Sequence, residues 1–381
     1  MEIKKEALRL HSEKKGKIEI ISKVKIQDKK DLSLAYSPGV AEPCLEIKNN
    51  PEKVYDYTSK GNLIAVISDG SAVLGLGNIG PEASLPVMEG KAILFKEFAN
   101  IDAFPLILNT QNVEEIIKTI KIISKGFSGI NLEDISAPRC FEIEERLNKE
   151  LDIPVFHDDQ HGTAIVVLAG LINSLKIVEK KVSEVKVVIN GAGAAGIAIS
   201  KLLNKYGFRN IILVDTEGAI NKSRINLNKY KQEISEFNLK DESGSLEKVI
   251  KNADVFIGVS LGNLVTSSMV KSMNKDPIIF ALANPIPEIS PDLALKAGAR
   301  IVATGRSDFP NQVNNVLAFP GVFRGILDSR VKKINEEMKI SAAEALASLI
   351  KDEVREDYIL PDIFDKRVVK EVSEAIIKTI K

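Results

Sequence analysis

The sequence has few of the residues that mark special structural classes. Its 381 residues include no tryptophan and only two cysteines, Cys44 and Cys140. Two cysteines are too few for a disulfide scaffold and their spacing matches no metal motif, so both are expected to be buried thiols. No run approaches the ~18 consecutive apolar residues that a membrane span requires. The charged N-terminus also lacks the apolar core of a secretory signal, so a cytoplasmic location without membrane attachment is predicted.

The chain lacks an excess of charge of either sign. Its 52 basic and 52 acidic side chains give a formal net charge of zero, so no field of one sign draws it toward nucleic acid. Hydrophobic residues make up 44% of the chain and charged residues 27%, as in ordinary globular proteins. At about 150 residues per domain, the length predicts two or three domains, and two is the working count.

Short runs rich in β-branched residues alternate with helical stretches in the second half of the sequence. The strand candidates span residues 185–190, 211–215, 254–258, 278–282 and 301–304. This alternation predicts a doubly wound, Rossmann-type parallel sheet.

The first half of the sequence predicts a separate α/β domain. Its strand candidates span residues 63–67, 104–108 and 129–131, and a helix is expected over 113–125. A helix over 163–175 would link the two domains, which places the boundary near Gly162. We therefore expect an N-terminal domain over residues 1–161, the doubly wound domain over 162–340 and a C-terminal helical segment over 341–381. That segment carries two amphipathic stretches separated by a turn at Pro361.

A glycine-rich turn follows the first strand of the doubly wound domain and opens a helix. It reads Gly191-Ala-Gly193-Ala194-Ala195-Gly196, and an acid, Asp215, ends the next strand 19 residues later. Glycines in this pattern permit a tight turn, a close approach of backbone N–H groups to a pyrophosphate, and close helix–sheet packing. The context therefore predicts binding of a dinucleotide such as NAD or NADP at this turn. A tight turn without a ligand is the alternative.

Two adjacent pairs of acids follow strand-like runs in the first half, Glu133-Asp134 and Asp158-Asp159. Carboxylates that converge at the carboxyl edge of a sheet repel one another unless a cation neutralises them. Oxygen ligands of this kind favour Mg²⁺ or Mn²⁺. A zinc or iron site that includes His157 and His161 is an open alternative, as are plain capping or surface carboxylates.

Four further side chains are candidates for chemistry. Lys91 begins an apolar helical run, where partial burial would lower its pKa and make it a base. Tyr36 lies in a Ser-Pro-Gly turn, where its phenol would face a cleft. Asn284 and Asn315 lie at loop positions of the second domain, where amides can bind carboxylates or ribose oxygens. The alternatives are an ordinary surface lysine, a buried structural tyrosine and two turn-forming asparagines.

Taken together, these segments resemble the malic enzymes in their compact prokaryotic form, from about residue 33 to residue 328. The most specific stretches are residues 68–80 (SDGSAVLGLGNIG), 86–91 (PVMEGK), 155–164 (VFHDDQHGTA) and 305–317 (GRSDFPNQVNNVL). The resemblance implies oxidative decarboxylation of L-malate to pyruvate and CO₂, with reduction of NAD⁺ or NADP⁺. It also implies dependence on a divalent metal and decarboxylation of oxaloacetate.

The resemblance also implies roles for individual residues. Lys91 would be the general base and Tyr36 the general acid, with Asp158 beside the lysine. The implied metal ligands are Glu133, Asp134 and Asp159, and the implied substrate contacts are Asn284 and Asn315. Larger members of the family carry an arginine at the position of Ala72, so the group that replaces this charge is open. Compact members are usually homodimers or larger assemblies, in which the tyrosine-bearing segment reaches the partner's active site.

The choice of dinucleotide depends on the neighbours of Asp215. An acid at this position accepts hydrogen bonds from the ribose hydroxyls and repels a 2′-phosphate, which favours NAD. Lys222 and Arg224 follow closely and would weaken that repulsion. Two other functions stay open at this point: a dehydrogenase of another small substrate, and a dinucleotide-binding protein without catalysis.

Overall fold

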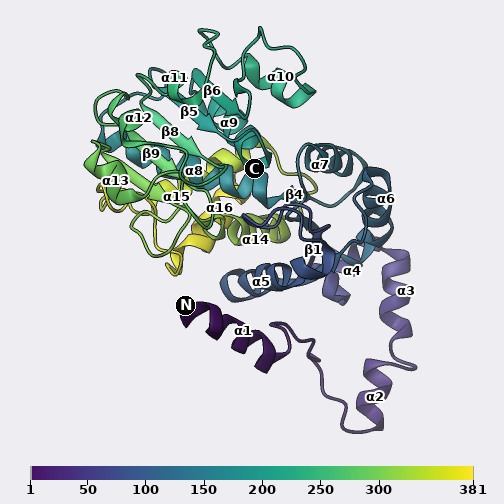
Figure 1. The fold of residues 1–381 in the computed structure, drawn as a ribbon. Helices are drawn as coiled ribbons and strands as arrows, with labels where there is room; N and C mark the ends of the chain where they lie inside the picture. The colour runs from purple at the N-terminus through teal and green to yellow at the C-terminus, as the bar shows by residue number, and fades with distance from the viewer. Residues whose placement is uncertain (1, 381) are drawn as a thin grey trace.

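The computed structural model describes residues 2–380 and consists of two α/β units with an N-terminal arm that extends away from them (Figure 1). The first unit is built on a parallel sheet of four strands in the order β2-β1-β3-β4. Its strands are β1 (Leu63–Ser68), β2 (Asp102–Ile107), β3 (Gly129–Leu132) and β4 (Val155–His157). The inner strands β1 and β3 are almost fully buried, which explains why their residues are mostly apolar, with Ser68 and Asn131 as the polar exceptions.

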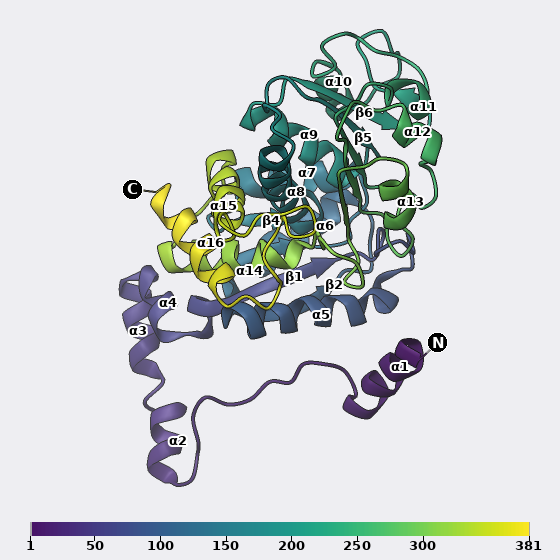
Figure 2. The ribbon, with the colours of Figure 1, turned by 90° about the vertical axis from the view of Figure 1, so that its left-hand side faces the viewer.

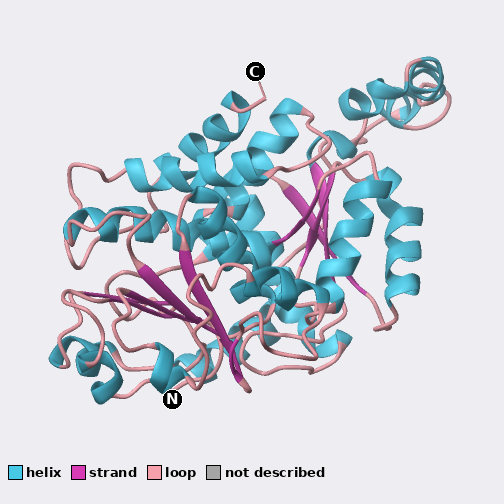
Figure 3. Ribbon diagram, turned by 90° about the horizontal axis from the view of Figure 1, so that it is seen from above, coloured by secondary structure: helices cyan, strands magenta, loops and turns pink. Residues whose placement is uncertain are grey.

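The second unit is built on a six-stranded sheet in the order β10-β9-β8-β5-β6-β7. All its strands are parallel except the short β7. The strands are β5 (Lys186–Asn190), β6 (Asn210–Asp215), β7 (Gly218–Ala219), β8 (Val255–Gly258), β9 (Ile278–Ala281) and β10 (Ile301–Thr304). The predicted α/β fold with a Rossmann-type sheet is confirmed. Figure 3 shows the two sheets apart from each other, with helices between them.

Helices cover both sheets. The first unit carries α5 (Pro81–Ala99), α6 (Val113–Ile123) and α7 (Arg139–Glu150); the second carries α9 (Ala194–Tyr206), α10 (Lys229–Ser235), α11 (Leu246–Val249), α12 (Ser267–Lys271) and α13 (Pro291–Lys296). Helix α6 begins where the side chain of Asn112 accepts hydrogen bonds from two first-turn N–H groups, as a favourable N-cap does. No helix between residues 2 and 380 is long and apolar enough to cross a lipid bilayer.

One long helix, α8 (Asp158–Ile177), joins the two units. It begins directly after β4, five residues before the predicted linking helix over 163–175. The C-terminal part of the chain packs against it: α15 (Glu336–Ser348) contacts α8, and α16 (Arg367–Lys378) contacts both α15 and α14 (Phe319–Ser329). The predicted pair of C-terminal helices corresponds to α15 and α16, separated by a long loop, although α15 begins five residues before the predicted start of the segment at residue 341.

The N-terminal arm consists of α1 (Glu2–Lys14), α2 (Lys29–Ala35), α3 (Ala41–Asn49) and the short α4 (Val54–Tyr57). Figures 1 and 2 show α2 and α3 projecting from the body, and neither helix buries a side chain. Many of the arm's apolar side chains are exposed, among them Ile20, Ile21, Val24, Leu32, Leu34 and Leu45. The prediction of two buried thiols is therefore wrong for Cys44, which is exposed on α3, whereas Cys140 is buried.

Candidate active site

The four acids predicted to converge lie at the carboxyl ends of two neighbouring strands. Strands β3 and β4 pair in parallel with Leu132 opposite His157, so the residues that follow each strand emerge at the same edge. One carboxylate oxygen from each of Glu133, Asp134 and Asp159 lies within 4.8 Å of the others. These three residues form the only such group of potential metal ligands within the part of the chain that the structure describes. We refer to them as the carboxylate triad.

The electrostatics of the triad fit a cation. Burial, and then the neighbouring Asp159, raise the pKa of Asp134 to about 8. Burial also raises the pKa of Glu133 well above its usual range, with further contributions from Asp158 and Asp159. Asp134 has a φ of 54°, which is strained for a residue with a side chain, and its buried Oδ2 has no hydrogen-bond partner among the described residues. Three crowded hard oxygen donors of this kind suit Mg²⁺ or Mn²⁺.

Lys91 projects from α5 into the same cluster. Its Nζ forms an ion pair with Asp158 and lies 3.1 Å from Oε1 of Glu133, and the side chain is only 13% exposed. Burial alone lowers the pKa of Lys91, but Asp158 and Glu133 together raise it well above its ordinary value. The expectation of a lowered pKa is therefore wrong, because these acids outweigh the effect of burial.

Two residues far apart in the sequence fix the side chain of Asp158. Asn315 donates a hydrogen bond from Nδ2 to Oδ2 of Asp158 at 2.5 Å. A Cβ at Gly162 would lie only 1.9 Å from Oδ1 of Asp158, so the carboxylate folds back over a helix position that has room only for glycine. The structure thus brings Asn315 to the acid cluster.

The loop over residues 69–80 joins the acid cluster to the second unit. The N–H of Ala72 donates to the main-chain oxygen of Asp134 at 2.9 Å. A Cβ at Gly75 would lie 1.9 Å from the main-chain oxygen of Asn284, so the loop touches the segment after β9 at that point. Asn284 therefore lies beside a loop that also contacts the triad.

The glycine-rich turn has the predicted geometry. Gly191 has a φ of 120°, and a Cβ there would lie 2.6 Å from the main-chain oxygen of Val259. A Cβ at Gly196 would lie 1.8 Å from the main-chain oxygen of Gly191, so only glycine permits this helix to approach the turn. Around Gly193, in contrast, no described atom lies within 4 Å of a Cβ position. The first-turn N–H groups of α9, which starts with Ala194 and Ala195, have no partners within the helix and can bind a phosphate.

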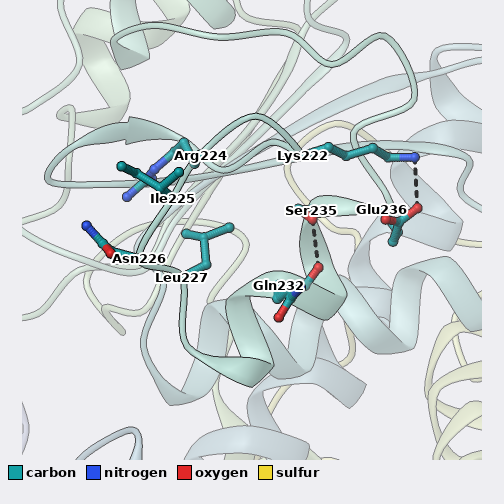
Figure 4. A pocket seen from close by; sticks show the side chains of 8 residues that line it. All are labelled: Lys222, Arg224, Ile225, Asn226, Leu227, Gln232, Ser235 and Glu236. Carbon is teal, nitrogen blue, oxygen red and sulfur yellow. Dashed lines mark hydrogen bonds and ion pairs between the residues drawn. The ribbon is translucent and has the colours of Figure 1, made fainter.

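Asp215 at the end of β6 is surrounded by cations. Its carboxylate accepts hydrogen bonds from Arg224 at 2.8 Å and Lys231 at 2.7 Å. Burial raises the pKa of Asp215, but these two partners lower it overall. Lys222 instead pairs with Glu236, across a hollow of about 350 Å³ that Arg224 also lines (Figure 4). Sequence reasoning named Arg224 and Lys222 but missed Lys231.

The structure does not bring Tyr36 to Lys91 within one chain. Tyr36 ends α2 on the projecting arm and is 68% exposed, whereas Lys91 lies on α5 in the body (Figure 2).

The two histidines do not join the carboxylate triad in a zinc-type site. His157 is fully buried, and burial lowers its pKa; its Nε2 lies 3.4 Å from Oδ2 of Asp159. His161 turns away from the triad and contacts Glu144 on α7. The geometry therefore favours the oxygen-ligand alternative over the zinc or iron alternative.

A cation near Ala72 was missed by sequence reasoning. Arg139, at the start of α7, donates to Oδ2 of Asp69 at 2.8 Å and to Oγ of Ser71 at 2.9 Å. Its other donors contact Ser136 and the main-chain oxygen of Gln111. Arg139 therefore holds the loop beside Ala72, and no local sequence pattern marks it.

Comparison with known proteins agrees with this geometry over almost the whole chain. Residues 15–148 match the model of the malic enzyme N-terminal domain, and residues 160–381 match that of the malic enzyme NAD-binding domain. The chain belongs to the malic enzyme family. The predicted family and enzyme class are thus confirmed.

Individual malic enzymes are similar to the chain over most of their own length. The bifunctional malic/malolactic enzyme of Bacillus subtilis is 62% identical, over 99% of this chain and 93% of the relative. The NAD-dependent malic enzyme of Geobacillus stearothermophilus is 58% identical, over 95% of this chain and 76% of the relative. The crystal structure of the NAD-dependent malic enzyme of Thermotoga maritima superposes with a TM-score of 0.94 at 52% identity, and the match covers 97% of this chain and 98% of that one. Other malic enzymes, named as NADP-dependent, match over only half of their own length: the match covers 51% of the enzyme of Rhizobium meliloti and 50% of that of Escherichia coli.

Proposed function

We propose that this malic enzyme converts L-malate to pyruvate and CO₂ while it reduces NAD⁺ or NADP⁺, and that it also decarboxylates oxaloacetate. The observation that carries the proposal is the convergence of Lys91 and the carboxylate triad at one sheet edge, next to a loop that touches Asn284 of the second unit. The family assignment weighs against the alternatives of another dehydrogenase and of a binding protein without catalysis.

The carboxylate triad is proposed to hold Mg²⁺ or Mn²⁺. Glu133, Asp134 and Asp159 offer three clustered oxygens, and the unpartnered Oδ2 of Asp134 is the kind of atom that a cation satisfies. When bound, such a cation supplies Lewis-acid stabilisation of negative charge on a substrate oxygen.

Proton transfer is assigned to Lys91 and Tyr36. Lys91 accepts the proton of the C2 hydroxyl through Nζ, while the hydride on C2 passes to the nicotinamide. Asp158, in direct contact with Nζ, can hold the proton that the lysine must first give up. After C4 leaves as CO₂, C3 needs a proton, which the hydroxyl of Tyr36 donates and Lys91 replaces. Asn284 and Asn315 are proposed to donate hydrogen bonds to the substrate.

The proposed function also assigns a role to each part of the chain. We propose residues 1–161 as the metal-binding catalytic domain, 162–340 as the NAD(P)-binding domain and 341–381 as the helical segment. The two family matches, over residues 15–148 and 160–381, support a boundary near residue 161, between the first two of these parts. A cytoplasmic location stays a prediction from the charged N-terminus.

We further propose that Tyr36 acts in the active site of a second copy of the chain. The tyrosine lies on an arm that buries none of its side chains in α2 and α3, and several apolar residues of this arm are exposed. Exposed apolar side chains gathered on one segment usually mark an interface. A homodimer or larger assembly that covers the arm would also supply the missing acid.

Hybrid dimers test whether Tyr36 acts in the active site of the second copy of the chain. Co-expression of Tyr36→Phe and Lys91→Ala chains with different tags should yield hybrids in which one of the two sites has both wild-type residues. We therefore expect the purified hybrid to form pyruvate at roughly half the wild-type rate, with each parent variant far below that. Lack of recovery in a hybrid that is isolated intact would show that the lysine and tyrosine act within one chain.

The choice of dinucleotide and the overall reaction are tested by one assay. With L-malate and Mn²⁺, we expect pyruvate to form with a higher kcat/KM for NAD⁺ than for NADP⁺, because Asp215 keeps its negative charge beside the ribose position. Asp215→Ala should shift this ratio toward NADP⁺ by at least about tenfold, since it frees Arg224 and Lys231 to bind a phosphate.

Lys222→Gln is the matched control, because Lys222 lines the same hollow but pairs with Glu236 (Figure 4). The Lys222→Gln variant should leave the ratio of kcat/KM for NAD⁺ to kcat/KM for NADP⁺ nearly unchanged. A wild-type preference for NADP⁺ above about tenfold would contradict the assignment of Asp215, and absence of pyruvate with both dinucleotides would contradict the proposed reaction.

A further inference from the structure

A second group of charged side chains lies behind the first turn of α8. Its centre is Glu144 on α7, a buried carboxylate. Glu144 accepts hydrogen bonds from the N–H of His157 at 3.0 Å, from Nε2 of Gln160 at 2.9 Å and from Nε2 of His161 at 2.8 Å. All three donors lie within residues 157–161, so one carboxylate binds the start of α8 at three points.

Lys339 extends this group to the C-terminal region. Its Nζ lies 3.2 Å from Nδ1 of His161 and 2.5 Å from Oε1 of Glu336, and its side chain is only 7% exposed. The ammonium group can only donate, so Nδ1 of His161 accepts and Nε2 carries the hydrogen that Glu144 receives. Helices α7, α8 and α15 are thus joined by a polar chain with consistent donors and acceptors.

The same helical turn carries the acids of the active site. Asp158 and Asp159 are the first two residues of α8, and their side chains reach Lys91 and the carboxylate triad, whereas Gln160 and His161 reach Glu144. A shift or rotation of this turn would therefore displace both acids together. Neighbours that orient a metal ligand commonly change metal affinity when they are removed.

We propose that Glu144 is a positioning residue, which fixes the first turn of α8 so that Asp159 can bind the metal and Asp158 can contact Lys91. His161 and Lys339 complete the arrangement and tie it to α15. The inference rests on the proposed metal site. A purely structural role for Glu144 would change stability but leave metal affinity as it is, so the two roles can be separated.

The test measures Mn²⁺ binding to the full-length, metal-free protein by isothermal titration calorimetry, without substrate. Glu144→Ala should raise the Kd for Mn²⁺ by about 10–100-fold, because Asp159 loses its support. The Kd for NAD⁺, measured by the same calorimetry, should stay within about twofold of wild type. Ile143→Ala is the matched control: it removes a buried side chain from the same helix without touching a donor of α8, so it should lower the melting temperature and leave the Kd for Mn²⁺ unchanged.

Rescue by a conservative variant adds a second measurement. His161→Gln keeps a donor for Glu144 and should bind Mn²⁺ nearly as wild type does, whereas His161→Leu should weaken binding. If Glu144→Ala does not fold, His161→Leu and Lys339→Met replace it, and both should raise the Kd.

The possible failures are distinguishable. Wild-type Mn²⁺ affinity in folded Glu144→Ala, or in both replacement variants, would overturn the positioning role. Wild-type Mn²⁺ affinity in Asp159→Ala would instead overturn the metal site on which the inference rests.

Discussion

Replacement of Lys91 by alanine is expected to reduce malate oxidation by ~10²–10⁴-fold, the usual contribution of a positioned general base. The lysine is the only cation that directly contacts both Asp158 and Glu133 in the part of the chain that the structure describes. Under the proposed mechanism, the variant lacks the base for the C2 hydroxyl, and the buried acids lose their counter-charge. The measurement is the rate of dinucleotide reduction at 340 nm with saturating L-malate and Mn²⁺.

Decarboxylation of added oxaloacetate should suffer less in Lys91→Ala. This step begins from a ketone and needs no removal of a hydroxyl proton, so the ratio of oxaloacetate decarboxylation to malate oxidation should rise. Tyr36→Phe should instead slow protonation of C3 and suppress exchange of the pyruvate methyl protons with deuterated solvent. Lys96→Ala is the matched control, because Lys96 lies on the same helix but is half exposed and paired with Asp102. Near-wild-type malate oxidation in Lys91→Ala would remove the lysine from the mechanism and leave Asp158 as the next candidate base.

Loss of the divalent cation is expected to abolish pyruvate formation. EDTA should stop the reaction, and Mn²⁺ or Mg²⁺ should restore it, because three crowded carboxylates suit a hard cation. Asp159→Ala should lose both Mn²⁺ binding and turnover but keep dinucleotide binding, since the glycine-rich turn lies on the other sheet. Calorimetric titrations with Mn²⁺ and with NAD⁺ measure the two affinities separately.

A control acid makes this experiment specific. Asp102→Asn changes an acid at the start of β2, within the same sheet but outside the triad, and should leave Mn²⁺ affinity unchanged. Recovery with zinc alone would contradict the choice of a hard cation and return attention to His157. An equal loss of Mn²⁺ and NAD⁺ binding in Asp159→Ala would contradict the separation of the two sites.

The sequence predicts the strands well because their signal is local. Residues 185–190 and 301–304 are short runs rich in β-branched residues, each preceded by a charged residue and followed by glycine. The structure has strands within one residue of those limits. The start of α8 is less predictable, since Asp-Asp-Gln-His-Gly before Thr163 has the composition of a loop. In the structure, Glu144 accepts hydrogen bonds from that segment although it lies 13 residues before His157, and no local pattern indicates this contact.

Contacts between residues far apart in the sequence explain the other differences between the predictions and the structure. Leu32 and Leu34 are apolar like core residues, but α2, on which they lie, buries no side chain in its own chain. The raised pKa of Lys91 depends on Asp158 and Glu133, which follow strands β4 and β3, and Lys231 reaches Asp215 from a helix 16 residues later. None of these pairings leaves a spacing pattern in the sequence, whereas motifs that act through their own backbone, such as the glycine-rich turn, do.

Helix α8 limits how this protein can be divided. It begins with two acids of the candidate active site, continues without a break into the second unit and ends after Ile177. If the chain were divided near residue 162, Asp158 and Asp159 would lie in a short helical fragment that is not stable by itself, because the first turn of a helix is stabilised by the turns that follow it. The parts of the chain before and after residue 162 therefore cannot be exchanged between proteins independently of each other. A chimera that combines the proposed metal-binding half of one protein with the nucleotide-binding half of another should instead be joined before β4 or after Ile177. All of α8 then comes from one parent protein.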